Sequence, residues 1–147
     1  MIDVENIRIR ELSAADTEDI AGIYASIVRK PVDKDFKALI EKHARSENDI
    51  CFVAELDGRV IGFMISYILT FGFGIEKSAW IATLGVDPDH MGRGIGDRLA
   101  REIFTLYKRM GISRVYTSVR WDSTDLLSFF KTLGFDRSKF INLKKDL

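Results

Sequence analysis

The stretch VDPDHMGRGIGDRL, residues 86–99, places three glycines within five positions, between a β-branched apolar run and an amphipathic segment. The first N–H groups of a helix carry partial positive charge and lack partners inside the helix. Gly92, Gly94 and Gly96 would let an anion approach such groups closely, and Arg93 adds a full positive charge. The pattern indicates an anion site, such as one for a diphosphate, with a simple tight turn from strand to helix as the alternative.

Two well-known phosphate-binding patterns do not fit this stretch. The G-x-G-x-x-G fingerprint, started at Gly92, requires a third glycine where the chain has Asp97. The G-x-x-x-x-G-K-[ST] pattern of P-loop proteins occurs nowhere in the chain. Neither of the two common nucleotide-binding folds is therefore supported.

Composition predicts one globular domain, residues 1–147, since 46% of the residues are hydrophobic, 30% are charged and no repeat or linker interrupts the chain. The 22 basic residues balance the 22 acidic ones, so no overall field favours nucleic acid or an anionic membrane. The longest apolar run, residues 60–75, is shorter than a membrane span. We expect a cytoplasmic protein that binds neither nucleic acid nor a membrane.

The numbers of cysteines and histidines limit the disulfides, nucleophiles and metal sites that the chain can form. Cys51 is the only cysteine, which excludes an internal disulfide, and its apolar surroundings predict a core position rather than a nucleophile. The two histidines, His43 and His90, are too few for a typical zinc site, so we expect no metal.

Hydrophobic periodicity predicts a mixed α/β sheet with helices on both faces. Ser13 and Asp16 resemble a capping box at the start of a helix, and Asp57-Gly58 predicts a type I′ turn between two strands. The expected order is β-α-α-β-β-β-α-β-α-β. The strands are expected over 7–12, 49–56, 59–69, 78–86, 114–119 and 139–145, and the helices over about 13–28, 34–45, 94–110 and 124–133.

Four segments in this order resemble the GCN5-related N-acetyltransferases, the GNAT superfamily. The glycine stretch reads Met91-x-x-Gly94-x-Gly96 after LGVDPDH, which is similar to motif A, [Q/R]-x-x-G-x-[G/A]. Residues 7–24, 52–64 and 126–135 are similar to the opening strand and helix, the hairpin and motif B of that family. The resemblance covers nearly the whole chain and implies the GNAT acyl-CoA N-acyltransferase fold.

The resemblance implies an enzyme that uses acetyl-CoA and moves its acetyl group directly to a primary amine. The acceptor is a protein N-terminus, a lysine or a small amine. By similarity, the pantetheine arm lies between the strand ending at residues 84–86 and the strand at 114–119, and the diphosphate lies on the amides of residues 91–97. The cofactor-binding residues implied in this way are Leu84, Gly85, Val86, Met91, Gly92, Arg93, Gly94, Ile95, Gly96, Asp97, Ser123 and Phe130.

Three positions depart from the family pattern. Met91 replaces the opening Gln or Arg of motif A, and Ser123 stands where motif B often has a cofactor-contacting Asn. Phe130 stands where many members have a tyrosine proposed to protonate the departing thiolate, and phenylalanine has no proton to give. The CoA thiolate would then leave without protonation or take a proton from water.

The general base is the least determined part of the expected site. The strand before motif A lacks the usual glutamate, and the nearest acid is Glu76. On a regular strand Glu76 would share the face of Ser78, Trp80 and Ala82 and act through a water chain. The alternative is a solvated glutamate at a strand end.

Other side chains are secondary candidates. Tyr24 and Tyr116 are possible acids, and His90 is placed to contact a phosphate, although each also has a purely structural interpretation. The aromatic residues that would line the acceptor side are Trp80, Phe71 and Phe73.

Two functions stay open at this point. The first is the N-acetyltransferase, as a monomer or a homodimer, with an acceptor site that is open or completed by a second subunit because the chain after residue 135 is short. The second is a non-catalytic acyl-CoA-binding sensor, which Phe130 and the missing strand glutamate favour.

Overall fold

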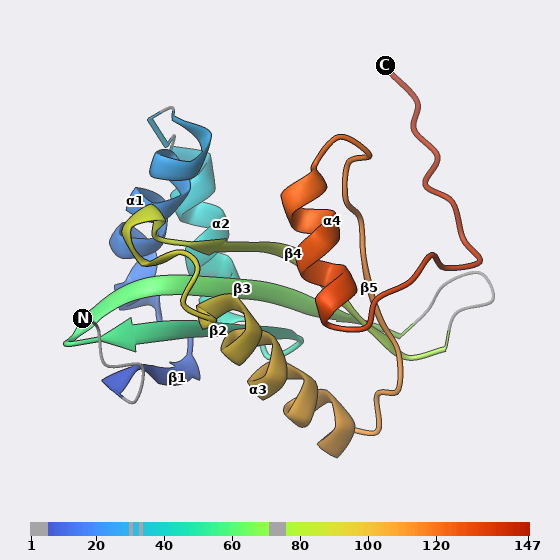
Figure 1. Ribbon diagram of the computed structural model, residues 1–147, viewed down its shortest axis with the longest axis horizontal. Coiled ribbons are helices and arrows are strands. Elements are labelled where there is room, and N and C mark those ends of the chain that lie inside the picture. Colours follow the sequence, from blue (N-terminus) through green and yellow to red (C-terminus); the bar gives the residue numbers. More distant parts are fainter. Residues whose placement is uncertain (1–5, 30, 33, 71–75) are drawn as a thin grey trace.

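The computed structural model describes residues 6–29, 31–32, 34–70 and 76–147. Over these residues five strands form one sheet in the order β1-β2-β3-β4-β5, as Figure 1 shows. Neighbouring strands are antiparallel except β4 and β5, which are parallel. The elements are β1 Arg8–Glu11, α1 Thr17–Val28, α2 Lys34–Arg45, β2 Asp49–Leu56, β3 Arg59–Leu69, β4 Ser78–Val86, α3 Ile95–Arg109, β5 Val115–Thr117 and α4 Thr124–Thr132.

The predicted capping box before α1 is confirmed. The Ser13 backbone N–H donates to Asp16 Oδ2 at 2.8 Å, and the Ser13 hydroxyl accepts from the Ala15 N–H at 3.3 Å. A short 3-10 turn, Ala14–Asp16, leads into α1, which ends at Val28 as predicted.

The predicted hairpin is also confirmed. Asp57 and Gly58 have φ values of 51° and 79°, the left-handed conformation that a type I′ turn requires of both central residues. The turn joins β2 to β3, and the two strands pair antiparallel as predicted.

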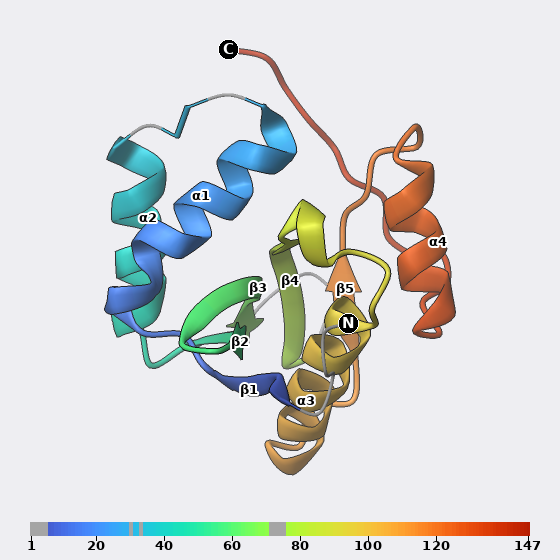
Figure 2. The same ribbon diagram turned by 60° about the vertical axis from the view of Figure 1, so that its left-hand side comes forward.

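Helices cover both faces of the sheet, as predicted. Figure 2 shows α1 and α2 on one side and α3 on the other. The first face buries Ile20 and Ile40 against Phe63 and Ile65, and the second buries Leu99 and Ile103 among a larger apolar cluster. No helix in the described part of the chain is long and apolar enough to cross a membrane.

The predicted last strand, residues 139–145, is wrong. The chain after α4 carries no strand, and it touches the β5 region only through side chains. Phe140 lies edge-on to Tyr116 with ring centroids 6.0 Å apart, and Asn142 Nδ2 donates to Ser118 Oγ at 2.8 Å. A strand needs a ladder of backbone hydrogen bonds, and β5 is only three residues long.

Candidate active site

The sheet opens between β4 and β5. Three residue pairs join these strands, and the last is Ile81 with Thr117, whose hydroxyl donates to the Ile81 carbonyl at 3.0 Å. Beyond this pair β4 continues to Val86, which is still paired with Gly62 of β3 on its other edge. The segment Ala82–Val86 therefore has one free backbone edge among the described residues.

A β-bulge lies where the two strands separate. Thr83 pairs with Ile65 and Ile81 pairs with Ser66, so Ala82 has no partner on β3. An extra residue of this kind bends its strand and increases the local twist. The bulge thus marks the point from which β4 runs on without β5.

The glycine stretch forms a loop of unpartnered amides beyond β4. Gly92 and Gly94 have φ values of 78° and 76°, and a Cβ added to either would meet no atom within 4 Å. The backbone N–H groups of residues 92–97 donate to no other described residue. The first such bond after them runs from the Arg98 N–H to the Gly94 carbonyl, at 3.0 Å. Gly94 is the N-cap of α3, so the amides of residues 95–97 belong to the first turn of the helix, where N–H groups have no partner within the helix.

Two glycines of the region are required by packing instead. A Cβ on Gly96 would lie 3.0 Å from Phe129 Cε2 of α4, and a Cβ on Gly85 would lie 2.8 Å from Phe63 Cε1. The three-glycine pattern predicted ligand approach at Gly96 and did not indicate its contact with Phe129. The glycine pattern contains no signal for a residue more than thirty positions away.

The predicted cofactor residues fall into three groups, at the end of β4, in the loop before α3 and at α4. Met91, at 58% exposure, and Arg93 are exposed at the loop, and Leu84, Gly85 and Val86 form the end of β4 with the free edge. Ser123 is the N-cap of α4 and makes no side-chain capping bond.

Phe130 lies in the hydrophobic core. The residue is 5% exposed, and its ring packs edge-on against Phe129 and Phe135, with centroids 5.3 and 5.0 Å away. Its contact with a cofactor stays a prediction.

Glu76 lies outside β4, so the strand parity that would place it on the face of Ser78, Trp80 and Ala82 does not apply to it. Glu76 is exposed and lies two residues before β4, which begins at Ser78. Six residues of extended chain span about 20 Å, so Glu76 is far along the chain from Ala82 at the bulge. Its role as a base stays a prediction.

Aromatic side chains line the α1 and α2 face beside the opening. Tyr67, Trp80 and Tyr116 occupy matching positions on β3, β4 and β5, and the rings of Trp80 and Tyr116 stack at 4.8 Å. The Trp80 indole N–H donates to Ser78 Oγ at 3.1 Å. Phe71 and Phe73, also predicted here, lie outside the described residues.

Tyr24, a secondary candidate, and Cys51, predicted to lie in the core, both pack within the fold. Tyr24 stacks on Phe36 with centroids 4.3 Å apart. Cys51 is 7% exposed on β2, and burial raises the pKa of its thiol to about 12. The predicted core position of Cys51 is confirmed.

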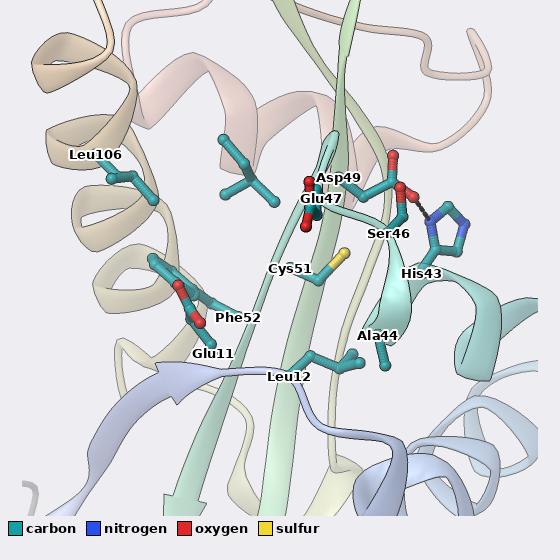
Figure 3. Close-up of a pocket in the computed structure, with 11 residues that line it drawn as sticks. Glu11, Leu12, His43, Ala44, Ser46, Glu47, Asp49, Cys51, Phe52 and Leu106 are labelled. Atoms are coloured by element: carbon teal, nitrogen blue, oxygen red, sulfur yellow. Dashed lines mark hydrogen bonds and ion pairs between the residues drawn. The ribbon is translucent and has the colours of Figure 1, made fainter.

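A cavity of about 190 Å³ lies elsewhere, at the edge of β2 (Figure 3). It is bounded by the end of α2, where His43 Nδ1 lies 2.6 Å from Asp49 Oδ2, and by Leu106 of α3. Since β3 separates β2 from β4 in the sheet, this cavity is distinct from the opening beside β4. None of its lining residues belongs to the predicted cofactor set.

Known proteins resemble this chain in sequence and in fold. Residues 9–135 match the profile of the Acetyltransferase (GNAT) family. The N-alpha-acetyltransferase RimI of Mycobacterium tuberculosis is 30% identical over 135 residues, which cover 92% of this chain and 82% of that protein.

Solved structures share the fold at lower identity. The aminoglycoside acetyltransferase meta-AAC0020 from an uncultured soil sample, in complex with sisomicin, matches with a TM-score of 0.82 at 20% identity, over 97% of each chain. AAC(6′)-Iy in complex with a CoA-containing bisubstrate analogue matches with a TM-score of 0.83 at 17% identity, over 96% of this chain and 98% of that one.

Proposed function

This chain belongs to the acetyltransferase (GNAT) family, with acetyl-CoA as co-substrate, and on that premise we propose that it moves the acetyl group directly to a primary amine. The observation that carries the proposal is the row of unpartnered N–H groups at residues 92–97, which follows the free edge of β4 in the chain. Membership in a family of acetyltransferases supports an enzyme over a non-catalytic acyl-CoA-binding module.

The loop is proposed to bind the diphosphate of CoA. Hydrogen bonds to a charged group contribute about 1.5–3 kcal/mol each, and the dipole of α3, a helix of 15 residues, favours an anion at its start. Arg93 is exposed on the same loop and supplies a full charge for the diphosphate or for the ribose phosphate. Ser123 and Phe130 near α4 complete the proposed set.

The pantetheine arm is proposed to lie along the free edge of β4. Its two amides would pair with backbone groups of Ala82–Val86 in the way that an extended peptide adds to a sheet edge. Leu84, Gly85 and Val86 are therefore proposed as backbone contacts. This arrangement brings the thioester toward the bulge at Ala82.

The acceptor is proposed to approach over Trp80 and Tyr116, whose rings lie beside the last pairs of β4 and β5. An amine of pKa near ~10.4 is protonated at neutral pH, and aromatic faces attract such a cation. The amine must lose its proton before it attacks the thioester carbon. Water, with Glu76 as the more distant candidate, takes the proton, and the sulfur leaves as thiolate with the electrons of the C–S bond. The acceptor is a protein N-terminus, a lysine or a small amine.

Calorimetry of CoA binding tests the loop. Gly94→Ala strains a residue at φ 76° and places a Cβ in the open space through which the diphosphate is proposed to approach the amides, so CoA affinity should fall about tenfold or more. Gly111→Ala is the matched control, since Gly111 has φ 77° and equally open surroundings at the other end of α3. The two variants should lose similar stability, and only the first should lose affinity. Equal CoA affinity in both would contradict the loop assignment.

Release of the CoA thiol from acetyl-CoA tests the reaction. Wild-type protein is expected to release thiol in the presence of at least one amine from a panel of an Ala-initiated peptide, a lysine peptide and a small polyamine. Glu76→Gln should slow this release if Glu76 is the base, and should leave it unchanged if water alone takes the proton. CoA binding without thiol release on any acceptor would contradict the proposed transfer.

A further inference from the structure

A buried carboxylate lies at the junction between β4 and the amide loop. Asp87 follows β4, and its side chain is 13% exposed. Its backbone N–H donates to the Ile61 carbonyl at 2.8 Å, and its Oδ1 accepts from the Asp89 N–H at 3.2 Å. These bonds fix Asp87 four residues before the loop begins at Met91.

Two basic side chains flank the other carboxylate oxygen of Asp87. His90 Nδ1 lies 3.3 Å from Asp87 Oδ2, and Arg59 Nη2 lies 3.9 Å from the same atom. His90 Nδ1 is buried and is not aligned for a hydrogen bond with any described residue. His90 Nδ1 therefore faces the Asp87 carboxylate without a directional hydrogen bond.

This arrangement matters because of what the loop is proposed to bind. A shielded carboxylate next to a diphosphate repels it through a medium less polar than water. Asp97 also carries a negative charge in this region, but it is 40% exposed and pairs with Arg101 at 2.6 Å. Asp87 is less open to solvent, and Arg59, at 70% exposure, offsets its charge only weakly. Among the described residues, His90 Nδ1 is the basic nitrogen that lies closest to the Asp87 carboxylate, at 3.3 Å.

We propose that His90 is a positioning residue for the co-substrate, one that in its protonated form offsets the charge of Asp87 and thereby raises the affinity of the loop for the diphosphate of CoA. The inference rests on the proposed function, since it presumes that the diphosphate lies on residues 91–97. It predicts that His90 raises the affinity for ligands that contain the diphosphate and leaves the affinity for pantetheine, which lacks it, unchanged.

Calorimetric titration with CoA and with pantetheine, which lacks the diphosphate, tests the proposal. His90→Phe keeps a ring of similar size and removes both ring nitrogens. We expect CoA affinity to fall about tenfold and pantetheine affinity to stay unchanged. In an Asp87→Asn background, where the capping oxygen is kept and the charge is gone, His90→Phe should leave CoA affinity unchanged.

His43→Phe provides the matched control. His43 is also a histidine beside a carboxylate, 2.6 Å from Asp49 Oδ2, but it lies at the edge of β2. This variant should bind CoA like the wild type. Thermal unfolding of each variant reports whether it is folded at the titration temperature.

The outcomes separate this inference from the proposed function. An equal loss for CoA and pantetheine in His90→Phe, or a loss that persists in the Asp87→Asn background, overturns the role of His90. Unchanged CoA affinity in His90→Phe overturns it as well, while leaving the amide loop intact. A wild-type protein that binds pantetheine as tightly as CoA overturns the proposed diphosphate site itself.

Discussion

At the scale of single residues, Asp16 fixes the corner between β1 and α1. Its two oxygens accept from Arg10 Nη1 and Nη2, each at 2.8 Å, and Oδ2 also accepts from the Ser13 N–H. Burial by itself would raise the pKa of Asp16, but the bonds from Arg10 and Ser13 and the charge of Arg10 outweigh it and lower the pKa. The carboxylate is thus held in its charged form.

Asp16→Asn is expected to destabilise the fold by about 1–3 kcal/mol at neutral pH, because it breaks a shielded ion pair. The folded-state pKa is lower than the unfolded one, so this stabilisation is present above about pH 4 and is lost as pH falls through the folded-state pKa. Urea unfolding from pH 7 to pH 2 should show the difference between variant and wild type shrinking with acid. A difference that stays constant would refute the linkage.

Cys51 is expected to be inert in the folded protein. Its thiol is 7% exposed and has a pKa of about 12, so thiolate is scarce at pH 8. A chromogenic disulfide reagent should titrate no thiol in the native state and one thiol in guanidinium. Rapid reaction of the native protein would mean that β2 opens locally.

At this scale, the interactions that could be predicted from the sequence are those between residues close together in the chain. Ser13 with Asp16 and Asp57 with Gly58 are neighbours in the chain, so their patterns were readable directly. The parity rule does not reach Glu76, because it holds only within a regular strand and β4 begins at Ser78, as predicted.

At the scale of elements, α3 and α4 meet where a helix position lacks a side chain. Gly96 in the first turn of α3 faces the ring of Phe129 in α4, and Phe129 packs in turn on Phe130. This contact sets how closely α4 approaches the amide loop. The position of α4 therefore depends on a glycine within the proposed binding loop.

Gly96→Ala is expected to cost about 1–3 kcal/mol, because the new Cβ would lie 3.0 Å from Phe129. Phe129→Leu in the same chain should recover part of the loss by making room. Gly22→Ala in α1 is the control, since a Cβ there meets nothing within 4 Å and should stabilise the helix by about 0.5–1 kcal/mol. Urea unfolding measures all three, and a neutral Gly96→Ala would argue against this packing.

The bounds of a helix or strand could be predicted where the pattern of its own residues determines the structure. The bounds of α2 and of the β2–β3 hairpin match the periodic pattern closely. Residues 139–145 also alternate, but a strand forms only beside a partner, and β5 ends at Thr117. That information lies in the tertiary structure and not in the segment.

At the scale of the whole molecule, the candidate site lies where the two helical layers and the open end of the sheet meet. The amide loop leads into α3 on one face, and Trp80 and Tyr116 lie on the face of α1 and α2. The resemblance predicted an opening between the strand that ends at residues 84–86 and the strand at 114–119, and in the structure the two strands separate after Ile81. It could not supply the bulge at Ala82 or the pairing of His90 with Asp87.

Removal of residues 141–147 is expected to leave the fold intact. In Figure 1 this tail runs away from the sheet, and Ile141 and Leu143 are 83% and 86% exposed. The loss of the Asn142 to Ser118 hydrogen bond should cost less than about 1 kcal/mol and lower the melting temperature by less than about 4 °C. A larger, cooperative loss would show that the tail is part of the folded core.

The free edge of β4 has a consequence for the protein before it meets its co-substrate. The unpaired backbone N–H and C=O groups along this edge can form hydrogen bonds with a strand of another chain. Without a bound co-substrate, the edge of β4 therefore favours self-association. Coenzyme A, seated along that edge, would act as a surrogate strand. The co-substrate would then also keep the protein from self-associating. A solution of the protein without acetyl-CoA would become turbid before one that contains it.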